Sequence, residues 1–562
     1  MTEAVGRVLG TLDAMPLEFW VAVEEGQYLQ LDDVVEVATL LPDGNEIRLF
    51  GVVDLVRARH EGAKFDSDVF LVERGVLPAT VAHAAHVKVT RVEPEIFVPP
   101  RPGQEVRRAT GLRRDQALFF DGMERKVPIG LSRDGEPVFA NLDFLDGSRG
   151  AHVNISGISG VATKTSYATF LLHSLFTSGA LGGEAANTHA IVFNVKGEDL
   201  LFLDQENARL KDEDRQAYAK MGLPAESFGS VQILAPVRKG SAERLPATGS
   251  RGEGVRAFFW TIREVVEERL LRFLFAEADD GGASQLSFVV DRIEAKLAAA
   301  ASAKGGAKDA WIEIEGRKVE TFDDLVETLA DHPDGDESLA ERWSRPAAPG
   351  TVAAFERRLH AAAKHVGHLI RGRDVGKRAD HVLDWKSKQL SVVDIHALHD
   401  RAKRFVVGAV LKRMFEEKES LGTARPLVFV VLDELNKYAP REGSGPIKEV
   451  LLDISERGRS LGIVLVGAQQ TASEVESRIV ANASLRVVGR LDAAEAERPE
   501  YGFLTAAGRG RAGILKPGTM IVLQPEIPTA LLVRFPFPAW ATRKSEAAEP
   551  AGADPFAGFR DR

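Results

Sequence analysis

The chain has 562 residues, a formal net charge of −10 and a hydrophobic content of 44%. This length predicts several domains with sizeable cores, and the acidic balance excludes a broad basic surface for nucleic acid, so that any DNA contact has to be local. The absence of cysteine excludes disulfides and cysteine-based zinc sites. No apolar run approaches the ~20 residues of a membrane span, and the start of the chain lacks a secretory-signal pattern. We therefore expect a cytoplasmic protein.

Residues 1–100 contain short apolar runs separated by turns. Examples are EFWVAV, DVVEVATLL, IRLFGVVDLVRAR and HVKVTRVE. Short strands at this spacing predict a small β-barrel, which suits either assembly or partner docking. Residues 94–112 are rich in proline and arginine and are predicted to be a linker. It leads into the first core elements, within the segment 101–150.

A glycine-containing loop follows a short apolar strand in residues 152–166, HVNISGISGVATKTS. Glycines let backbone N–H groups and a helix N-terminus approach a phosphate tail, Lys164 adds charge near the outer phosphates, and the Thr165 hydroxyl can ligate Mg²⁺. The loop departs from the G-x-x-x-x-G-K-[ST] pattern, because Thr163 precedes the lysine and the loop has one extra residue. An ordinary strand-to-helix connection is the alternative. The predicted nucleotide-binding residues are Gly157, Gly160, Val161, Ala162, Thr163, Lys164, Thr165 and Ser166.

Strands and helices alternate beyond this loop, which predicts a doubly wound α/β core. Residues 151–250 form its first part, with a buried parallel strand at 190–195 and further strands in LLFLD and SVQILAP. Residues 251–385 have helical periodicity and predict a mainly helical insertion. Residues 386–540 resume the core and end in a hairpin. The segment 541–562 is polar and rich in Ala and Pro, and is predicted to be disordered.

The apolar run LVFVVLDEL ends in Asp433 and Glu434. The carboxyl ends of parallel strands face the ligand crevice, where an aspartate can hold Mg²⁺ through water and a glutamate can polarise a water for attack on a γ-phosphate. A strand followed by an acidic helix N-cap is the alternative. The glycine-Lys-Thr loop and the Asp-Glu strand together indicate a nucleotide-binding protein.

Two further segments fit a nucleoside triphosphatase. The strand GIVLVGAQQ ends in Gln469 and Gln470, which are placed to sense a γ-phosphate or to orient water, or else to satisfy loop backbone. The segment ISERGRSLG carries Arg457 and Arg459. In ring ATPases an arginine from a neighbouring subunit stabilises transition-state charge and is worth ~10³–10⁵ in rate. A solvated or ion-paired arginine is the alternative for each of them.

The ordered set of motifs resembles the HerA family of hexameric DNA-translocating ATPases, which is related to the FtsK motors. The matching segments, in chain order, are GRVLG and DVVEV, HVNISGISGVATKTS, IVFNVKGED, LVFVVLDEL, SERGRSLGIVLVGAQQTASEV and KPGTMIVLQPEIPTALLVRF. They cover most of the chain. The resemblance implies a RecA-like P-loop ATPase core with a small N-terminal β-barrel and a helical insertion.

The resemblance also implies roles for single residues. It gives phosphate binding to Lys164, metal binding to Thr165 and Asp433, catalysis to Glu434, and sensing to Gln470 with Gln469 beside it. The candidates for an arginine acting on a neighbouring subunit are, in order of preference, Arg459, Arg457 and Arg149. Asn194 stands where many relatives have an aspartate.

For the whole assembly, the resemblance implies a homo-hexamer with ATP and Mg²⁺ at the subunit interfaces and double-stranded DNA in the central channel. Family members work with a docked nuclease or other effector, such as NurA in end resection or other enzymes in anti-phage defence. The leading hypothesis is therefore an ATP-driven DNA translocase or helicase. One alternative is a nucleotide-stabilised ring scaffold that hydrolyses ATP weakly and organises an effector enzyme. Another is a related soluble packaging motor.

Overall fold

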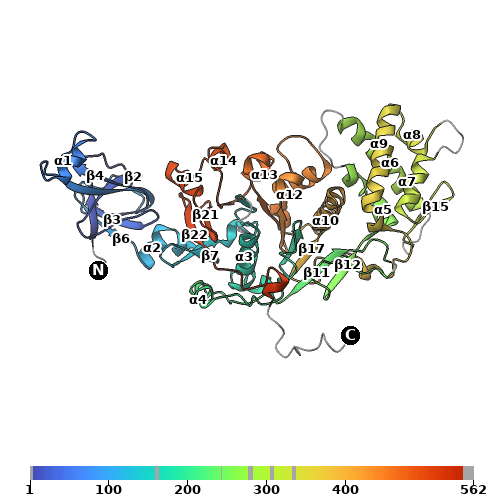
Figure 1. Ribbon diagram of the computed structural model, residues 1–562, viewed down its shortest axis with the longest axis horizontal. Coiled ribbons are helices and arrows are strands. Elements are labelled where there is room, and N and C mark those ends of the chain that lie inside the picture. The colour runs from blue at the N-terminus through green and yellow to red at the C-terminus, as the bar shows by residue number, and fades with distance from the viewer. Residues whose placement is uncertain are drawn as a thin grey trace, which may run out of the picture. The chain divides into compact units, whose positions relative to one another are not determined.

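The computed structural model describes residues 4–158, 164–241, 243–275, 283–303, 309–331 and 337–547 (Figure 1). The chain forms two compact units. The first unit comprises residues 1–144 and 485–535, and the second comprises residues 145–484 and 536–562. Residues 485–535, which the sequence places with the second part of the core, thus group with the N-terminal segment.

The first unit begins with the predicted small barrel, a closed barrel of six strands. The strands are β1 Ala4–Val8, β2 Glu18–Val23, β3 Val34–Leu40, β4 Glu46–Glu61, β5 Thr80–Glu93 and β6 Glu105–Arg108, in the order β1-β2-β5-β4-β3-β6. Alternate residues face inward, so that Val35 and Val37 are buried while Val34 and Glu36 are partly exposed. The barrel core is almost entirely aliphatic, with Phe19 as its aromatic member. Helix α1 Asp68–Glu73 lies between β4 and β5 in the chain.

Strand β6 lies within residues 94–112, and here the structure corrects the prediction of a linker. β6 pairs antiparallel with both β1 and β3, and Val106 is fully buried in the barrel. The strand closes the barrel. It has only four residues, and the proline-rich stretch directly before it hides so short a strand from pattern analysis.

The rest of the first unit contains an antiparallel ladder of five strands. Its members are β7 Lys126–Leu131, β8 Pro137–Asn141, β20 Leu485–Val488, β21 Thr519–Leu523 and β22 Leu531–Arg534. Strands β21 and β22 form the hairpin within KPGTMIVLQPEIPTALLVRF, and β22 continues the ladder to β7 and β8. Three short helices accompany it, α2 Leu112–Ala117, α14 Ala493–Ala496 and α15 Ala506–Ala512.

The second unit is built on a parallel sheet in the order β12-β11-β17-β10-β18-β19-β9. Its strands are β9 Val153–Ser156, β10 His189–Asn194, β11 Val231–Pro236, β12 Val255–Phe258, β17 Leu390–Asp394, β18 Val428–Asp433 and β19 Ile463–Gln469. Every residue of β9, β10, β17 and β19 is buried, as expected for strands that are covered on both faces. Because the strands are parallel, their carboxyl ends meet at one edge of the sheet.

Helices connect these strands. They are α3 Lys164–Thr177, α4 Asp212–Lys220, α10 Asp400–Leu421, α11 Leu435–Tyr438, α12 Pro446–Leu461 and α13 Ser477–Ala481. Helix α3 packs on β9 and β19, and α10 and α12 pack on each other. Residues 200–204, predicted as a strand, form turns instead. Their apolar side chains are buried as in a strand, which explains the error.

Between β12 and β17 the described residues are mainly helical. The helices are α5 Ile262–Glu267, α6 Ala283–Ala303, α7 Phe322–Ala330, α8 Leu339–Ser344 and α9 Pro349–Val366, and α6 to α9 pack together as one group (Figure 1). Capping boxes at Thr261, Thr321 and Ser338 fix the starts of α5, α7 and α8. Two short ladders join β13 Trp260–Thr261 to β16 Ile370–Arg371 and β14 Ile312–Ile314 to β15 Arg317–Val319. Among the described helices, none combines the length and apolar character that a membrane crossing requires.

The C-terminal segment is ordered further than the sequence predicts. Trp540 is buried against His173 and Phe228, and Ala541 is fully buried. Glu546 accepts hydrogen bonds from the backbone and hydroxyl of Thr542. Residues 541–547 are therefore held by the buried Trp540 before them and by hydrogen bonds to residues 205–208, whereas the predicted disorder of 548–562 lies outside the described residues.

Candidate active site

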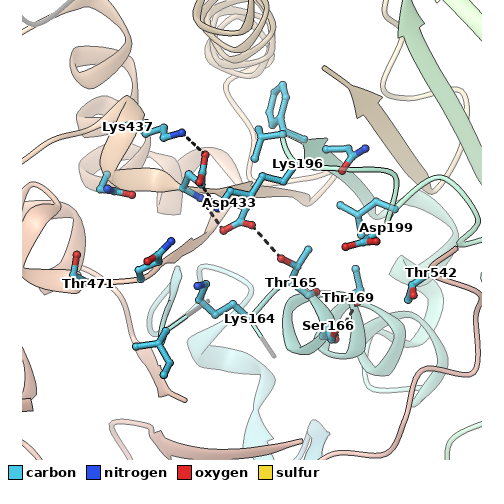
Figure 2. Close-up of a pocket in the computed structure, with 18 of the residues that line it drawn as sticks. Lys164, Thr165, Ser166, Thr169, Lys196, Asp199, Asp433, Lys437, Thr471 and Thr542 are labelled. Carbon is cyan, nitrogen blue, oxygen red and sulfur yellow. Dashed lines mark hydrogen bonds and ion pairs between the residues drawn. The ribbon is translucent and has the colours of Figure 1, made fainter. Parts of the chain in front are cut away.

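A cavity of about 500 Å³ lies at the carboxyl edge of the parallel sheet in the second unit (Figure 2). It is lined by residues of the loop before α3, the first turn of α3, the turn after β10, the end of β18 and the loop after β19. This volume lies within the range of small-molecule sites. The cavity therefore brings together the glycine-Lys-Thr loop and the Asp-Glu strand, which are far apart in the sequence.

Lys164 is the first residue of α3 and is buried, with only 7% of its surface exposed. Its ammonium Nζ donates a hydrogen bond to the carbonyl oxygen of Gly157, at 2.7 Å. Burial lowers the pKa of Lys164, and the nearby Lys196 ammonium lowers it further, while the Asp-Glu carboxylates act in the opposite direction. The lysine is thus held at the base of the loop, facing the cavity.

The middle of the loop, Gly160, Val161, Ala162 and Thr163, lies outside the described residues. Thr165 and Ser166 lie in the first turn of α3 and line the cavity. The N-terminus of α3 therefore borders the cavity, and unpaired N–H groups and the helix dipole at such an end favour anions.

Asp433 ends β18 and meets Thr165 across the cavity. The Thr165 hydroxyl donates to Asp433 Oδ2 at 3.2 Å, and Asp433 Oδ1 accepts from the backbone N–H of Glu434 at 2.8 Å (Figure 2). A hydroxyl and a carboxylate are hard oxygen ligands, and Mg²⁺ is usually held by one or two carboxylates together with substrate phosphates. The donor set therefore fits Mg²⁺. Over the described ranges no group of three or more His, Cys, Asp or Glu could hold a metal by itself.

Glu434 follows Asp433 in a left-handed backbone conformation, with φ 57° and ψ 41°. It is the N-cap residue of α11, yet its side chain makes no capping hydrogen bond. Instead one carboxylate oxygen is ion-paired with Lys196, and the other with Lys437 at 2.8 Å. Burial alone would raise the pKa of Glu434, but the hydrogen bonds from the two lysines outweigh it and lower that pKa. The acidic N-cap alternative thus describes the position of Glu434 and not its side-chain contacts.

The two glutamines at the end of β19 have different surroundings. Gln470 lines the cavity. Gln469 is fully buried, and its Nε2 donates to Asn154 Oδ1 at 3.0 Å, which links β19 to β9. The structure therefore brings Gln470 to the site and gives Gln469 an inter-strand contact.

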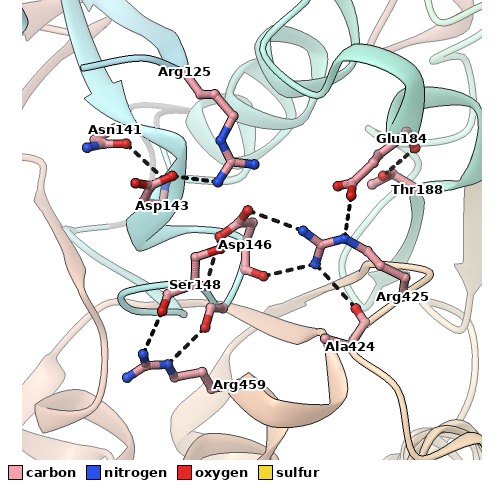
Figure 3. A network of polar contacts seen from close by, with 11 residues as sticks. Arg125, Asn141, Asp143, Asp146, Ser148, Glu184, Thr188, Ala424, Arg425 and Arg459 are labelled. Carbon is pink, nitrogen blue, oxygen red and sulfur yellow. Dashed lines mark hydrogen bonds and ion pairs between the residues drawn. The ribbon is translucent and has the colours of Figure 1, made fainter. Parts of the chain in front are cut away.

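None of the three candidate arginines belongs to the described lining of the cavity. Arg457 is ion-paired with Glu419. Arg459 donates to the carbonyl oxygens of Gly147 and Ser148, at 2.9 and 2.7 Å (Figure 3). Within one chain Arg459 thus holds the loop that carries Arg149, and a contribution of any of the three to a neighbouring subunit stays a prediction.

No protein-family model matches the sequence, and no curated protein matches it. Similar solved structures include VirB4 of Thermoanaerobacter pseudethanolicus, which is 16% identical with a TM-score of 0.44 over 74% of this chain and 97% of that chain. The plasmid coupling protein TrwB in complex with ADP and Mg²⁺ is 13% identical, with a TM-score of 0.47 over 77% of this chain and 95% of that chain. The genome packaging NTPase B204 from Sulfolobus turreted icosahedral virus 2, in complex with ATP-gammaS, is 14% identical, with a TM-score of 0.20 over 27% of this chain and 69% of that chain. The resemblance of the motifs to the HerA family stays a prediction.

The structure adds residues to the site that the sequence argument does not single out. Lys196 and Lys437 neutralise Glu434, and Thr542 and Arg543 reach the cavity from the C-terminal segment. Lys437 follows Glu434 by three residues, a spacing at which opposite charges meet on a helix. No comparable signal in the sequence connects the C-terminal segment to the cavity.

Proposed function

We propose that the second unit is an ATPase core that binds ATP and Mg²⁺ in this cavity. One observation carries the proposal: the hydroxyl of Thr165 and the carboxylate of Asp433 lie within hydrogen-bonding distance across a cavity that also contains Lys164 and Glu434. A phosphate-binding cation, two oxygen ligands for a metal and a carboxylate base are the groups that phosphoryl transfer to water requires. Here they converge on one cavity from the start of helix α3 and from the end of strand β18.

Each residue has a separate task in this proposal. Lys164 binds the phosphates through its ammonium, and Thr165 and Asp433 hold Mg²⁺. When bound, Mg²⁺ neutralises the charge that develops on the phosphate oxygens. Glu434 accepts the proton of the attacking water, and Gln470 orients that water or contacts the terminal phosphate. The ion pairs of Glu434 have to loosen before it can act as a base.

At the level of the assembly, we propose an ATP-driven translocase or helicase for double-stranded DNA that acts as a cytoplasmic homo-hexamer with a nuclease or other effector. This part rests on the ordered motifs and their resemblance to the HerA family. The acidic net charge of −10 supports a local DNA contact, such as the inside of a ring, over a broad basic face.

A nucleotide-stabilised scaffold is the second candidate, and one observation favours it. Both oxygens of the Glu434 carboxylate are occupied by lysines, which makes it a poor proton acceptor in this arrangement. A ring that binds ATP in this state would hydrolyse it slowly and serve to organise an effector enzyme.

Binding of a fluorescent ATP analogue in the presence of Mg²⁺ tests the nucleotide site. We expect Lys164→Ala to weaken binding at least tenfold, because the variant removes a charge-assisted contact to phosphate. Lys220→Ala is the matched control, since Lys220 is an exposed lysine on α4 that does not line the cavity. Equal affinity of Lys164→Ala and wild type, or no binding by wild type, would overturn the proposal.

Single-turnover hydrolysis with and without duplex DNA separates the motor from the scaffold. A motor should hydrolyse bound ATP within seconds. Duplex DNA should raise its hydrolysis rate, because a translocase couples ATP hydrolysis to movement along DNA. Normal nucleotide binding with negligible turnover in both conditions would favour the scaffold instead.

A further inference from the structure

Lys196 lies in the cavity, where its ammonium acts on both Lys164 and Glu434. It follows β10 and lines the cavity. Its ammonium is ion-paired with Glu434, which follows the neighbouring strand β18 (Figure 2). Half of its side chain is exposed, at 51%, whereas the Glu434 side chain is only 14% exposed. The lysine is therefore the more exposed partner of this pair, and its charge also acts on Lys164 in the same space.

Hydrogen bonds of Asn194 fix the backbone turn that contains Lys196. The Asn194 amide Nδ2 donates to the carbonyl oxygen of Gly197 and to Asp394 Oδ1, both at 2.9 Å. Gly197 has a φ of 56°, in the left-handed region that favours glycine. Asp394, buried at the end of β17, is also bonded to His396 Nδ1 at 2.7 Å. An aspartate at position 194 would have no N–H to donate and would face the Asp394 carboxylate, which explains why an amide ends β10.

The two lysines that neutralise Glu434 differ in origin. Lys437 lies three residues after Glu434 on the same short helix, so it stays beside the carboxylate in any movement of that helix. Lys196 lies in the turn after β10, in a different part of the chain, and its side chain contacts Glu434 from there. Both lysines line the cavity and are equally exposed, at 51%, but Lys196 is the one whose charge acts on Lys164 at the base of the loop.

We propose that Lys196 contacts the terminal phosphate of a bound nucleoside triphosphate, and that it neutralises Glu434 only while that phosphate is missing. The inference rests on the proposed nucleotide site and deepens it. A terminal phosphate carries more negative charge than one carboxylate and offers more acceptor oxygens, so a half-exposed ammonium within reach of both moves to the phosphate. Glu434 then keeps Lys437 as its single cation and has one oxygen available for water.

This exchange gives the site a way to distinguish a triphosphate from a diphosphate. With a diphosphate, Lys196 has no terminal phosphate to bind and stays on Glu434. With a triphosphate, the same movement adds one contact to the ligand and releases the carboxylate. Affinity for the third phosphate and readiness for hydrolysis are therefore coupled through one side chain.

The ratio of affinities for a non-hydrolysable ATP analogue and for ADP tests the proposal by calorimetry. We expect Lys196→Gln to lower this preference about tenfold, the value of one charge-assisted hydrogen bond. Lys196→Arg should restore most of it. Lys437→Gln is the matched control, because it removes the other cation from the same carboxylate and should leave the ratio as in wild type, whatever its effect on turnover.

An unchanged affinity ratio in Lys196→Gln, or an equal change in Lys437→Gln, overturns the inference while the nucleotide site stands. Absence of nucleotide binding by wild type removes the proposed function itself.

Discussion

The barrel of the first unit and the parallel sheet of the second unit bury different kinds of residue. The barrel core is aliphatic, and polar side chains of its strands alternate outward. In the parallel sheet the strands are mainly apolar, but five of the seven end in a polar residue that is buried or nearly so. These strand-end residues are Ser156, Asn194, Asp394, Asp433 and Gln469.

The two units therefore differ in where their polar side chains lie: on the outside of the barrel in the first unit, and at the buried ends of strands in the second. A strand end that is buried and polar has to find partners, and in the second unit those partners come from other strands and from α3. The contacts Thr165–Asp433 and Asn194–Asp394 are of this kind. Substitutions in the barrel should therefore affect stability alone, whereas substitutions at the strand ends should affect ligand binding and turnover.

The largest effect is expected at Glu434. Glu434→Gln keeps the size of the side chain but removes the base, and should lower the hydrolysis rate about a thousandfold. Affinity for ATP should be kept within a few-fold. Single-turnover hydrolysis and nucleotide titration of the same preparation measure both quantities. Hydrolysis at the wild-type rate would show that Glu434 is not catalytic. The proposed difference in function between this edge of the sheet and the barrel would then fall.

The converse result is expected in the barrel. Phe19 is 1% exposed in the aliphatic core, so Phe19→Ala should lower the free energy of unfolding of the first unit by about 3 kcal/mol. Nucleotide affinity should not change, because the described lining of the cavity belongs to the second unit. Leu17→Ala is the control, since Leu17 is 60% exposed, and should change stability by less than about 0.5 kcal/mol. A loss of nucleotide binding in Phe19→Ala would contradict the separation of tasks.

Histidines should give the two units opposite pH dependences. Burial lowers the pKa of His152 and of His173 to about 4, so the folded second unit keeps both rings neutral while unfolded chains protonate them near pH 6.5. Stability is thus full above about pH 7 and falls as the pH drops towards 4, by roughly 2 kcal/mol for each ring at pH 5. In the barrel, a hydrogen bond to Asp54 raises the pKa of His86, so that contribution is present at low pH and is lost as the pH rises through the raised pKa.

Urea unfolding at pH 7 and pH 5 measures this difference. In His173→Phe the loss of stability between the two pH values should be about 2 kcal/mol smaller than in wild type. His86→Phe should make the opposite change in the first unit. An identical pH dependence of wild type and His173→Phe would show that the buried ring is not responsible.

The smallest expected effect concerns the turn after β10. Gly197 has a left-handed conformation with open space around it, so Gly197→Ala should cost about 1 kcal/mol of stability through backbone strain alone. Gly183→Ala is the control, because Gly183 also has open space but no positive φ, and it should be neutral or slightly stabilising. Equal effects of the two substitutions would mean that position 197 does not require the left-handed conformation.

Much of this organisation follows from sequence patterns. Continuous apolar runs predict the buried parallel strands, and alternating runs predict the barrel, because the two burial patterns differ in period. The carboxyl-edge rule is sufficient to bring Asp433 and the loop before α3 together. The error at residues 200–204 arises because buried turns carry the same apolar residues as strands.

Side-chain partners are a different matter. The ion pair between Lys196 and Glu434 and the inter-strand bond of Gln469 depend on which neighbour lies across the sheet, and a single sequence does not encode strand order. The packing of Trp540 depends on its contacts with His173 and Phe228, which are far away in the chain. Tertiary proximity, and not local pattern, decides each of these contacts.

The left-handed backbone of Glu434 has a consequence for how this protein can change. Glycine adopts that conformation without strain, so a glycine there would relieve roughly 1 kcal/mol of backbone strain. Engineering for thermostability alone would therefore favour Glu434→Gly, but this substitution removes the carboxylate. Position 434 is thus one where selection for robustness and selection for chemistry point in opposite directions.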